Sequence, residues 1–503
     1  MKIKTELLVL FSAAAICAQP VSIHKLESET HKRPAINSSA VLGAVNKTSG
    51  LNSTPTLNRA VFGFLPYWEY LNGDFNSVKY NLLTHIAVFS FEADSTGALT
   101  DPPGWPWIDF INLARNNNVR IIMTITCFDP NSIHKLLNDF TIRRQLFTNL
   151  LKKLLTQSLD GVNIDFENLI DTDKLYGVRN FFDDFKTFFS GFNLEVSFSS
   201  PAAGFGQWDF DSIAANCDYF FVMCYDFYGS WSSTTGPSSP LTGPTGNSAY
   251  NVFNTFSSDY ASIVHSTPGK LILGVPYYGN YWITSSRDAY APVTPLDTLK
   301  KKNNWQNVMA YKDIAPISSK YGALWDNGSQ TPWVRWQDTV WNQIWFDNDS
   351  SLALKFDLAI MNNLKGVGIW ALGYDNGRNE LWNLIDRKFN RPVGVQGQNS
   401  SIPTAYRLEQ NYPNPFNPST TIKYSIPAVE IPSSLRSSGQ ADPLITLKVY
   451  DLLGREVAIL VNEEKAPGNY TVKFDGSGLS SGLYFYTLRA GDFFQSRKMI
   501  FLK

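Results

Sequence analysis

The chain has 503 residues and a formal net charge of −1, from 43 basic and 44 acidic residues spread along it. At this length more than one domain is expected, and one of them can hold a large core. The balanced charge argues against a nucleic-acid interface and against a polybasic membrane patch, so we expect neither partner. The chain is also rich in aromatic residues, with 14 Trp, 23 Tyr and 34 Phe. Besides filling cores, such side chains line clefts that bind sugars, because an aromatic face buries the apolar face of a pyranose ring.

The amino terminus has the pattern of a secretory signal peptide over residues 1–18. Lys2 and Lys4 precede an apolar run that is too short to span a bilayer, and the small Ala18 comes before the expected cleavage point. No later apolar run is long enough for a transmembrane helix. Outside the signal peptide the chain has three cysteines, and their spacing indicates neither a disulfide framework nor a metal site. We therefore predict an exported chain with no metal and no cofactor.

Residues 19–57 are polar and rich in Ser, Thr and Asn, which predicts a flexible leader. From residue 58 to residue 391, short apolar runs alternate with longer helical patterns, which is the rhythm of βα units. The eight candidate strands are 61–64, 83–91, 120–126, 161–166, 195–199, 219–225, 271–276 and 366–371. They predict an α/β fold, a (β/α)8 TIM barrel. The alternative is an open doubly wound sheet, but no glycine-rich phosphate turn follows the first strand.

Two further regions depart from this rhythm. About ninety residues separate the seventh and eighth strands, and they predict a small α+β insertion before strand 8. Residues 392–405 have the composition of a linker. Residues 406–503 hold short alternating strands at 421–425, 445–450, 470–474 and 482–489, with a Ser-rich loop at 428–443, and predict a small Ig-like β-sandwich.

The fourth candidate strand carries polar groups where a buried strand is normally apolar. Asn163, Asp165 and Glu167 share one face of it, because successive side chains of a strand point to opposite sides. Two carboxylates on an inner face are costly to bury without partners or a function. The charge of Asp165 would disfavour a second negative charge on Glu167 and so help to keep Glu167 protonated. The alternative is a structural set of ion-paired or capping carboxylates at a strand end.

The barrel region resembles glycoside hydrolase family 18, the chitinases and related endo-N-acetylglucosaminidases, from about residue 60 to 388. Leu-Asp-Gly-Val-Asn-Ile-Asp-Phe-Glu at 159–167 is similar to the DxxDxDxE strand of the family, and Met-Cys-Tyr-Asp at 223–226 to its MxYD stretch. Other matching stretches at the ends of predicted strands are 64–68, 90–91, 274–279 and 368–370.

This resemblance implies substrate-assisted hydrolysis with retention, in which the N-acetyl group of the sugar attacks its own anomeric carbon. It implies that Glu167 is the acid and base, that Asp165 orients the acetamide, and that Tyr225 donates a hydrogen bond to the acetamide oxygen. The residues expected to bind substrate are Asn163, Asp226, Met223, Trp370, Tyr67, Tyr278 and Phe91. Asn163 stands where the family often has Asp, and we expect it to donate a hydrogen bond that holds Asp165 in place.

The substrate is left open by the sequence. The sequence around Asn163 is also similar to that of the branch of the family that acts on peptidoglycan fragments in spores. Chitin, peptidoglycan and other glycans with N-acetylglucosamine are therefore all candidate substrates. A barrel that binds such glycans as a non-catalytic lectin is the alternative from another class, and surface adhesion through the tail is a third.

The tail resembles the type A sorting domain of the type IX secretion system of Bacteroidetes and relatives. The matching stretches are Asn-Tyr-Pro-Asn-Pro-Phe-Asn-Pro at 411–418, Tyr-Asp-Leu-Leu-Gly-Arg at 450–455, Gly-Leu-Tyr-Phe at 482–485 and the basic end at 497–503. The resemblance implies that the secretion machinery is a partner and that the chain crosses the periplasm and the outer membrane, to be secreted or attached to the cell surface. The alternative is a carbohydrate-binding β-sandwich.

Overall fold

The computed structural model describes residues 22–31, 33, 57–204, 206–243, 250–294, 308–390, 406–427, 444–452, 454–491 and 493–503. These residues form two compact units, which divide between residues 393 and 394. The predicted signal peptide, the linker and the loop at 428–443 lie outside the described residues. No helix in the described ranges is long and apolar enough to cross a membrane.

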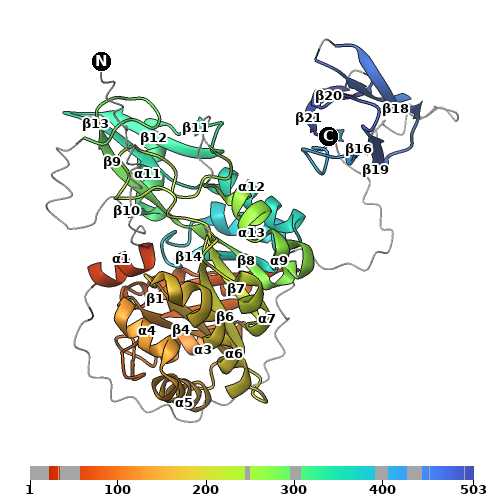
Figure 1. The fold of residues 1–503 in the computed structure, drawn as a ribbon. Coiled ribbons are helices and arrows are strands. Elements are labelled where there is room, and N and C mark those ends of the chain that lie inside the picture. The colour runs from red at the N-terminus through yellow and green to blue at the C-terminus, as the bar shows by residue number, and fades with distance from the viewer. Residues whose placement is uncertain are drawn as a thin grey trace, which may run out of the picture. The chain divides into compact units, whose positions relative to one another are not determined.

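The first unit contains a closed barrel of eight parallel strands (Figure 1). The strands are β1 (Ala60–Pro66), β2 (His85–Ala93), β4 (Arg120–Cys127), β5 (Gly161–Phe166), β6 (Glu195–Pro201), β7 (Tyr219–Met223), β8 (Leu271–Pro276) and β14 (Gly366–Trp370). They pair in the order β1-β14-β8-β7-β6-β5-β4-β2, and β1 also pairs with β2, which closes the ring. The short β3 (Leu99–Thr100) adds an antiparallel edge to β2. The prediction of a TIM barrel is confirmed.

Helices follow the strands around the barrel. They are α2 (Tyr67–Leu71), α3 (Ile108–Asn116), α4 (Pro130–Asn138), α5 (Phe140–Thr156), α6 (Val178–Phe188), α7 (Phe210–Asn216), α8 (Val252–Asn254), α9 (Ala261–Ser266), α12 (Asp349–Met361) and α13 (Asn379–Phe389). Three of them begin at aspartate caps, where Asp129, Asp139 and Asp209 accept hydrogen bonds from backbone N–H groups of the first turn. Alternation along β5 sends Phe166 outward against Phe181 of α6, with ring centroids 5.8 Å apart. The same alternation turns Asn163 and Asp165 into the barrel.

The predicted α+β insertion is also present. Its sheet has the order β10-β9-β13-β12-β11, with every neighbouring pair antiparallel. The elements are β9 (Tyr278–Thr284), β10 (Val308–Ala310), α11 (Tyr311–Tyr321), β11 (Leu324–Asp326), β12 (Thr331–Gln337) and β13 (Trp341–Trp345). Trp282, Trp333 and Trp345 form a small core of their own, in which the last two rings stack at 5.2 Å.

The second unit consists of two antiparallel sheets around a separate apolar core. One sheet holds β15 (Arg407–Leu408), β16 (Ser419–Ile426) and β19 (Gly468–Asp475). The other holds β18 (Glu456–Glu464), β17 (Leu444–Tyr450), β20 (Gly482–Ala490) and β21 (Phe493–Phe501) in that order. Alternating burial along β17 fits strands with one face on a core.

One stretch of the predicted flexible leader is not unstructured. Residues Ile23–Thr30 form a helix, α1, which begins at Ser22 and lies against the barrel (red in Figure 1). Ile23 and Leu26 are buried, at 1% and 3% exposed. An isolated helix of eight residues has little stability in water, so contacts with the barrel account for α1. The prediction of a leader without structure is therefore wrong for these residues.

Candidate active site

The carboxyl ends of the barrel strands bring the predicted catalytic residues together. Asp165 points inward from β5 and Glu167 follows that strand, while Tyr225 follows β7 and Trp370 ends β14. All four side chains are buried, and Asp165 and Trp370 have no exposed surface. This is the end of a TIM barrel at which active sites are built.

The environment of Glu167 suits a general acid. Burial, and after it the negative charge of Asp165, raises the pKa of Glu167 to about 8. At neutral pH the carboxyl group therefore holds a proton that it can give to a leaving group. Asp165 is ready to accept further hydrogen bonds, because its Oδ1 has no partner among the described residues.

Asp226, which directly follows Tyr225, lies in a hydrogen-bond network with Tyr278 and Ser238. Its backbone has a φ of 61°, and its Oδ1 accepts a hydrogen bond from the hydroxyl group of Tyr278, the first residue of β9. Ser238 donates to the Tyr278 hydroxyl at 3.0 Å and accepts from the backbone N–H of Asp226 at 3.1 Å. Burial raises the pKa of Asp226 to about 6. The network presents the second oxygen, Oδ2, to the cleft.

Asn163 does not hold Asp165, and that expectation is corrected. Its Nδ2 donates to Ser197 at 3.0 Å, and its Oδ1 accepts from Ser199 at 2.8 Å. Both serines point inward from β6, the neighbouring strand, which offers hydroxyl groups two residues apart. The amide of Asn163 thus links β5 to β6 beneath the site, and its side chain is fully buried.

Aromatic side chains form the floor and wall of the cleft. The Trp370 ring has Phe64 and Phe89 beside it, with centroids 5.5 and 4.8 Å away. Tyr67 and Trp68, which open α2, lie further along, and the Trp68 indole N–H donates to the Tyr374 hydroxyl at 3.2 Å.

Phe91, which was predicted to bind substrate, does not join these aromatic side chains. Phe91 packs against Trp105, because a register shift between Val88 and Phe91 changes which side chains of β2 turn inward, so Phe89 takes the place expected for Phe91. Met223 ends β7 and is partly buried against the barrel core.

The sequence interpretation missed a second set of residues, which enter the site from the leader. The imidazole of His24 stacks on Trp370 with centroids 3.8 Å apart. Its Nδ1 lies 2.9 Å from Asp165 Oδ2 and its Nε2 lies 2.7 Å from the Tyr225 hydroxyl. Ser22 donates to Glu167 Oε2. The spacing of apolar Ile23 and Leu26 behind the possible cap Ser22 was the only signal of this helix in the sequence.

The donor atoms of His24, Asp165 and Glu167 lie within 4.8 Å of one another, as ligands of one metal ion would. Hydrogen bonds to Asp165 and Tyr225 already account for both imidazole nitrogens. The cluster is therefore explained without an ion.

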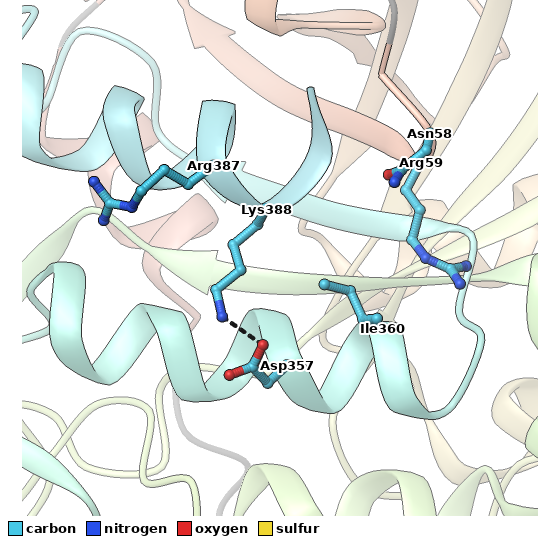
Figure 2. A pocket seen from close by; sticks show the side chains of 6 residues that line it. All are labelled: Asn58, Arg59, Asp357, Ile360, Arg387 and Lys388. Carbon is cyan, nitrogen blue, oxygen red and sulfur yellow. Dashed lines mark hydrogen bonds and ion pairs between the residues drawn. The ribbon is translucent and has the colours of Figure 1, made fainter. Parts of the chain in front are cut away.

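A hollow of about 380 Å³ lies away from this site (Figure 2). It is lined by Asn58 and Arg59 just before β1, by Asp357 and Ile360 of α12, and by Arg387 and Lys388 of α13. Lys388 is paired with Asp357 across it. The hollow is at the amino end of β1, where residues of a TIM barrel serve stability and not catalysis.

A closed parallel barrel with a buried glutamate of raised pKa beside an aspartate, above an indole floor, indicates a glycoside hydrolase of the TIM-barrel class. The chain belongs to the glycosyl hydrolases family 18, whose sequence profile matches residues 60–375. The profile of the secretion system C-terminal sorting domain matches residues 410–502, which indicates export.

Individual relatives agree with this family. The cortical fragment-lytic enzyme of Bacillus subtilis (strain 168) is 24% identical over 323 residues, which cover 61% of this chain and 68% of that protein. Human di-N-acetylchitobiase is 27% identical over 276 residues, which cover 50% of this chain and 69% of that protein. A family 18 chitinase from Cycas revoluta, solved as a mutant with (GlcNAc)4, superposes with a TM-score of 0.57 at 21% identity, over 65% of this chain and 99% of that one. At this identity the last comparison supports the fold alone.

Proposed function

We propose that the chain is an exported, retaining glycosidase that hydrolyses β-1,4 bonds next to N-acetylglucosamine, with Glu167 as acid and base. One observation carries this proposal. A flat polar ring stacks on Trp370, and two of its edges form hydrogen bonds with Asp165, at 2.9 Å, and with the Tyr225 hydroxyl group, at 2.7 Å. The group in this position is the imidazole of His24, whose two ring nitrogens take the places of the nitrogen and the oxygen of an acetamide.

The residues can then divide the reaction between them. Glu167 donates its proton to the leaving oxygen, while the acetamide oxygen of the substrate bonds to the anomeric carbon and the glycosidic bond breaks. Asp165 accepts a hydrogen bond from the acetamide N–H and stabilises the positive charge that develops, and Tyr225 donates to the acetamide oxygen. Water then attacks the anomeric carbon and gives a proton to Glu167, while the bond between that carbon and the acetamide oxygen breaks, which restores both the acid and the N-acetyl group. The second displacement returns the configuration to that of the substrate.

Peptidoglycan is the second candidate substrate. The similarity to a cortical fragment-lytic enzyme favours it, and the similarity to di-N-acetylchitobiase favours chitin fragments. Both polymers present the N-acetyl group that the proposed mechanism needs. Product analysis on chitin oligomers and on purified peptidoglycan separates the two.

The test compares Glu167→Gln with the parent chain on a chromogenic chitobiose or chitotriose substrate. Because α1 lies in the cleft, both are measured in the wild-type chain and in a His24→Ala chain. We expect Glu167→Gln to lower kcat by roughly 10²- to 10⁴-fold, the usual contribution of a positioned acid. Equal background rates with and without Glu167, together with retained binding of chitotriose, would leave the lectin as the better explanation.

A further inference from the structure

We propose that residues 22–33, which include α1, are an autoinhibitory segment that occupies the glycan cleft of its own chain as a substrate mimic. The inhibition part of this proposal rests on the proposed function, because only an active enzyme can be inhibited. The occupation of the cleft stands on contacts alone.

The segment contacts each group that the mechanism uses. Ser22 donates to Glu167, at the position where a leaving oxygen or a water would lie. The backbone N–H of Ile23 donates to Asp226 Oδ2 at 2.7 Å, as a sugar hydroxyl group would. The two ring nitrogens of His24 form hydrogen bonds with Asp165 and Tyr225. A helix that only covered the barrel would not need to form a separate hydrogen bond with each of Glu167, Asp165 and Tyr225.

Two rings of the segment lie on two indoles of the cleft. His24 stacks on Trp370 at 3.8 Å, and His31 stacks on Trp68 at 4.4 Å with planes only 8° apart. Aromatic faces are the surfaces on which pyranose rings stack. The Tyr67 hydroxyl also donates to the backbone carbonyl of His31. The segment therefore covers the ring faces of Trp370 and Trp68, on which successive sugars of a bound oligosaccharide would stack.

Arg33 adds contacts to the barrel next to those that His31 makes with Trp68. Its guanidinium pairs with Glu92 at 2.7 Å and donates to the backbone carbonyls of Ser90 and Asp101 at 3.0 and 2.8 Å. Arg33 also lies over the ring of Tyr67, 5.5 Å from its centroid. The segment is thus held at both ends and in the middle.

No polymer can reach the catalytic groups while the segment is in place. Asp165 and Trp370 are 0% exposed and Glu167 is 8% exposed. Hydrolysis requires the leaving oxygen, the acetamide and a water to enter that space. Release of α1 must therefore precede binding of substrate.

The contacts between α1 and the barrel are those of a segment that can be released. Ile23 and Leu26 are its apolar contacts, and most of the rest is polar. Glu27 accepts a hydrogen bond from the Trp370 indole at 3.0 Å, but its burial raises the pKa of this carboxyl to about 8, so its ionised form is disfavoured there. A permanent element of the core would bury apolar side chains at these positions.

The test changes α1 in the full-length chain and leaves the barrel untouched. His24→Ala and Glu27→Ala remove contacts to the cleft. Lys25→Ala and Glu29→Gln are the matched controls, because these side chains pair with each other on the outer side of the same helix. We expect the first two variants to raise the initial rate on the chitotriose substrate roughly ten- to hundred-fold, the effect of one lost hydrogen bond to a charged group. We expect the controls to match wild type.

Two further measurements do not depend on turnover. Binding of chitotriose is measured in Glu167→Gln chains with and without His24→Ala, and we expect the second change to tighten it by a similar factor. Hydrogen exchange of the α1 amides shows directly whether the helix is docked, because a released eight-residue helix exchanges like an unfolded peptide.

These measurements separate the two proposals. If all chains hydrolyse and bind substrate equally well, autoinhibition is wrong while the glycosidase stands. If the α1 amides exchange at unfolded rates, autoinhibition is wrong, and the hydrolysis assay alone decides the glycosidase. If the α1 amides are protected and no variant hydrolyses any glycan, the docked segment stands and the proposed function fails. If His24→Ala loses its folded barrel by circular dichroism while Lys25→Ala keeps it, α1 is a structural part of the core and autoinhibition is overturned.

Discussion

The raised pKa of Glu167 has two causes of different kinds, burial first and the charge of Asp165 second. Burial depends on the cleft as a whole, whereas the charge belongs to a single side chain. The second cause can therefore be removed by one substitution that keeps the size of the side chain.

Asp165→Asn should move the basic limb of the activity profile to lower pH. The acid acts only while it is protonated, and loss of the neighbouring charge lowers the pKa of Glu167, so activity is lost earlier as pH rises. The measurement is kcat/KM from pH 4 to 10 in His24→Ala chains with and without the substitution. Asp226→Asn is the control, because Asp226 is the last of the causes that raise this pKa and should shift the limb less. A limb that stays in place while the overall rate falls would contradict this role of Asp165.

Single residues also show what could be read from the sequence. The inward placement of Asp165 follows from period-two alternation along one strand, and the structure shows it. The partners of Asn163 could not be found in that way, because Ser197 and Ser199 belong to the next strand and only the register of β5 on β6 brings them opposite. Phe91 was expected in the cleft from the family resemblance, but with the register shift in β2 it is Phe89 that packs against Trp370.

At the scale of elements, strongly periodic segments were predictable and α1 was not. Each of the eight predicted barrel strands lies within about two residues of its observed bounds, because apolar runs between turn residues fix them locally. The polar composition of 19–57 gave no indication of the helix at Ile23–Thr30. Contacts with the cleft stabilise α1, since its hydrogen-bond partners there come from residues 141 to 343 positions away in the chain.

Docking of α1 should weaken as pH rises. Burial alone would lower the pKa of His24, but Asp165, Glu167 and Asp226 raise it above its ordinary value, and Tyr225 is its uncharged partner. A proton that binds more tightly in the docked state stabilises that state fully below the ordinary pKa of histidine and less as pH rises through the raised one. The raised pKa values of Glu167 and Asp226 act in the same direction.

The measurement is the opening free energy of the α1 amides by hydrogen exchange, corrected for intrinsic rates, at pH 5.5 and 8.5. We expect stronger protection at the lower pH. His24→Gln can still form a hydrogen bond but cannot be protonated, so it should reduce the difference. Protection that grows toward pH 8.5 would show that another group governs docking.

At the scale of the whole molecule, the two units have separate cores, and the catalytic residues all belong to the first. Removal of the residues from Pro403 onward should therefore leave kcat and KM unchanged. The same deletion should stop export, because the sorting profile matches only that part. Both are checked by assay of the purified protein and by fractionation of cells. Loss of hydrolysis on deletion would place the domain boundary elsewhere.

Because α1 and the barrel belong to one chain, the blocked fraction of molecules does not change with protein concentration. A tethered group competes at an effective concentration on the order of millimolar when its connection spans the sites. A soluble oligosaccharide would have to approach that concentration to open the cleft, whereas an insoluble polymer with many neighbouring sugars could do so by multivalent contact. Once the backbone between α1 and β1 is cut, the segment becomes an ordinary ligand, and dilution alone would switch the enzyme on.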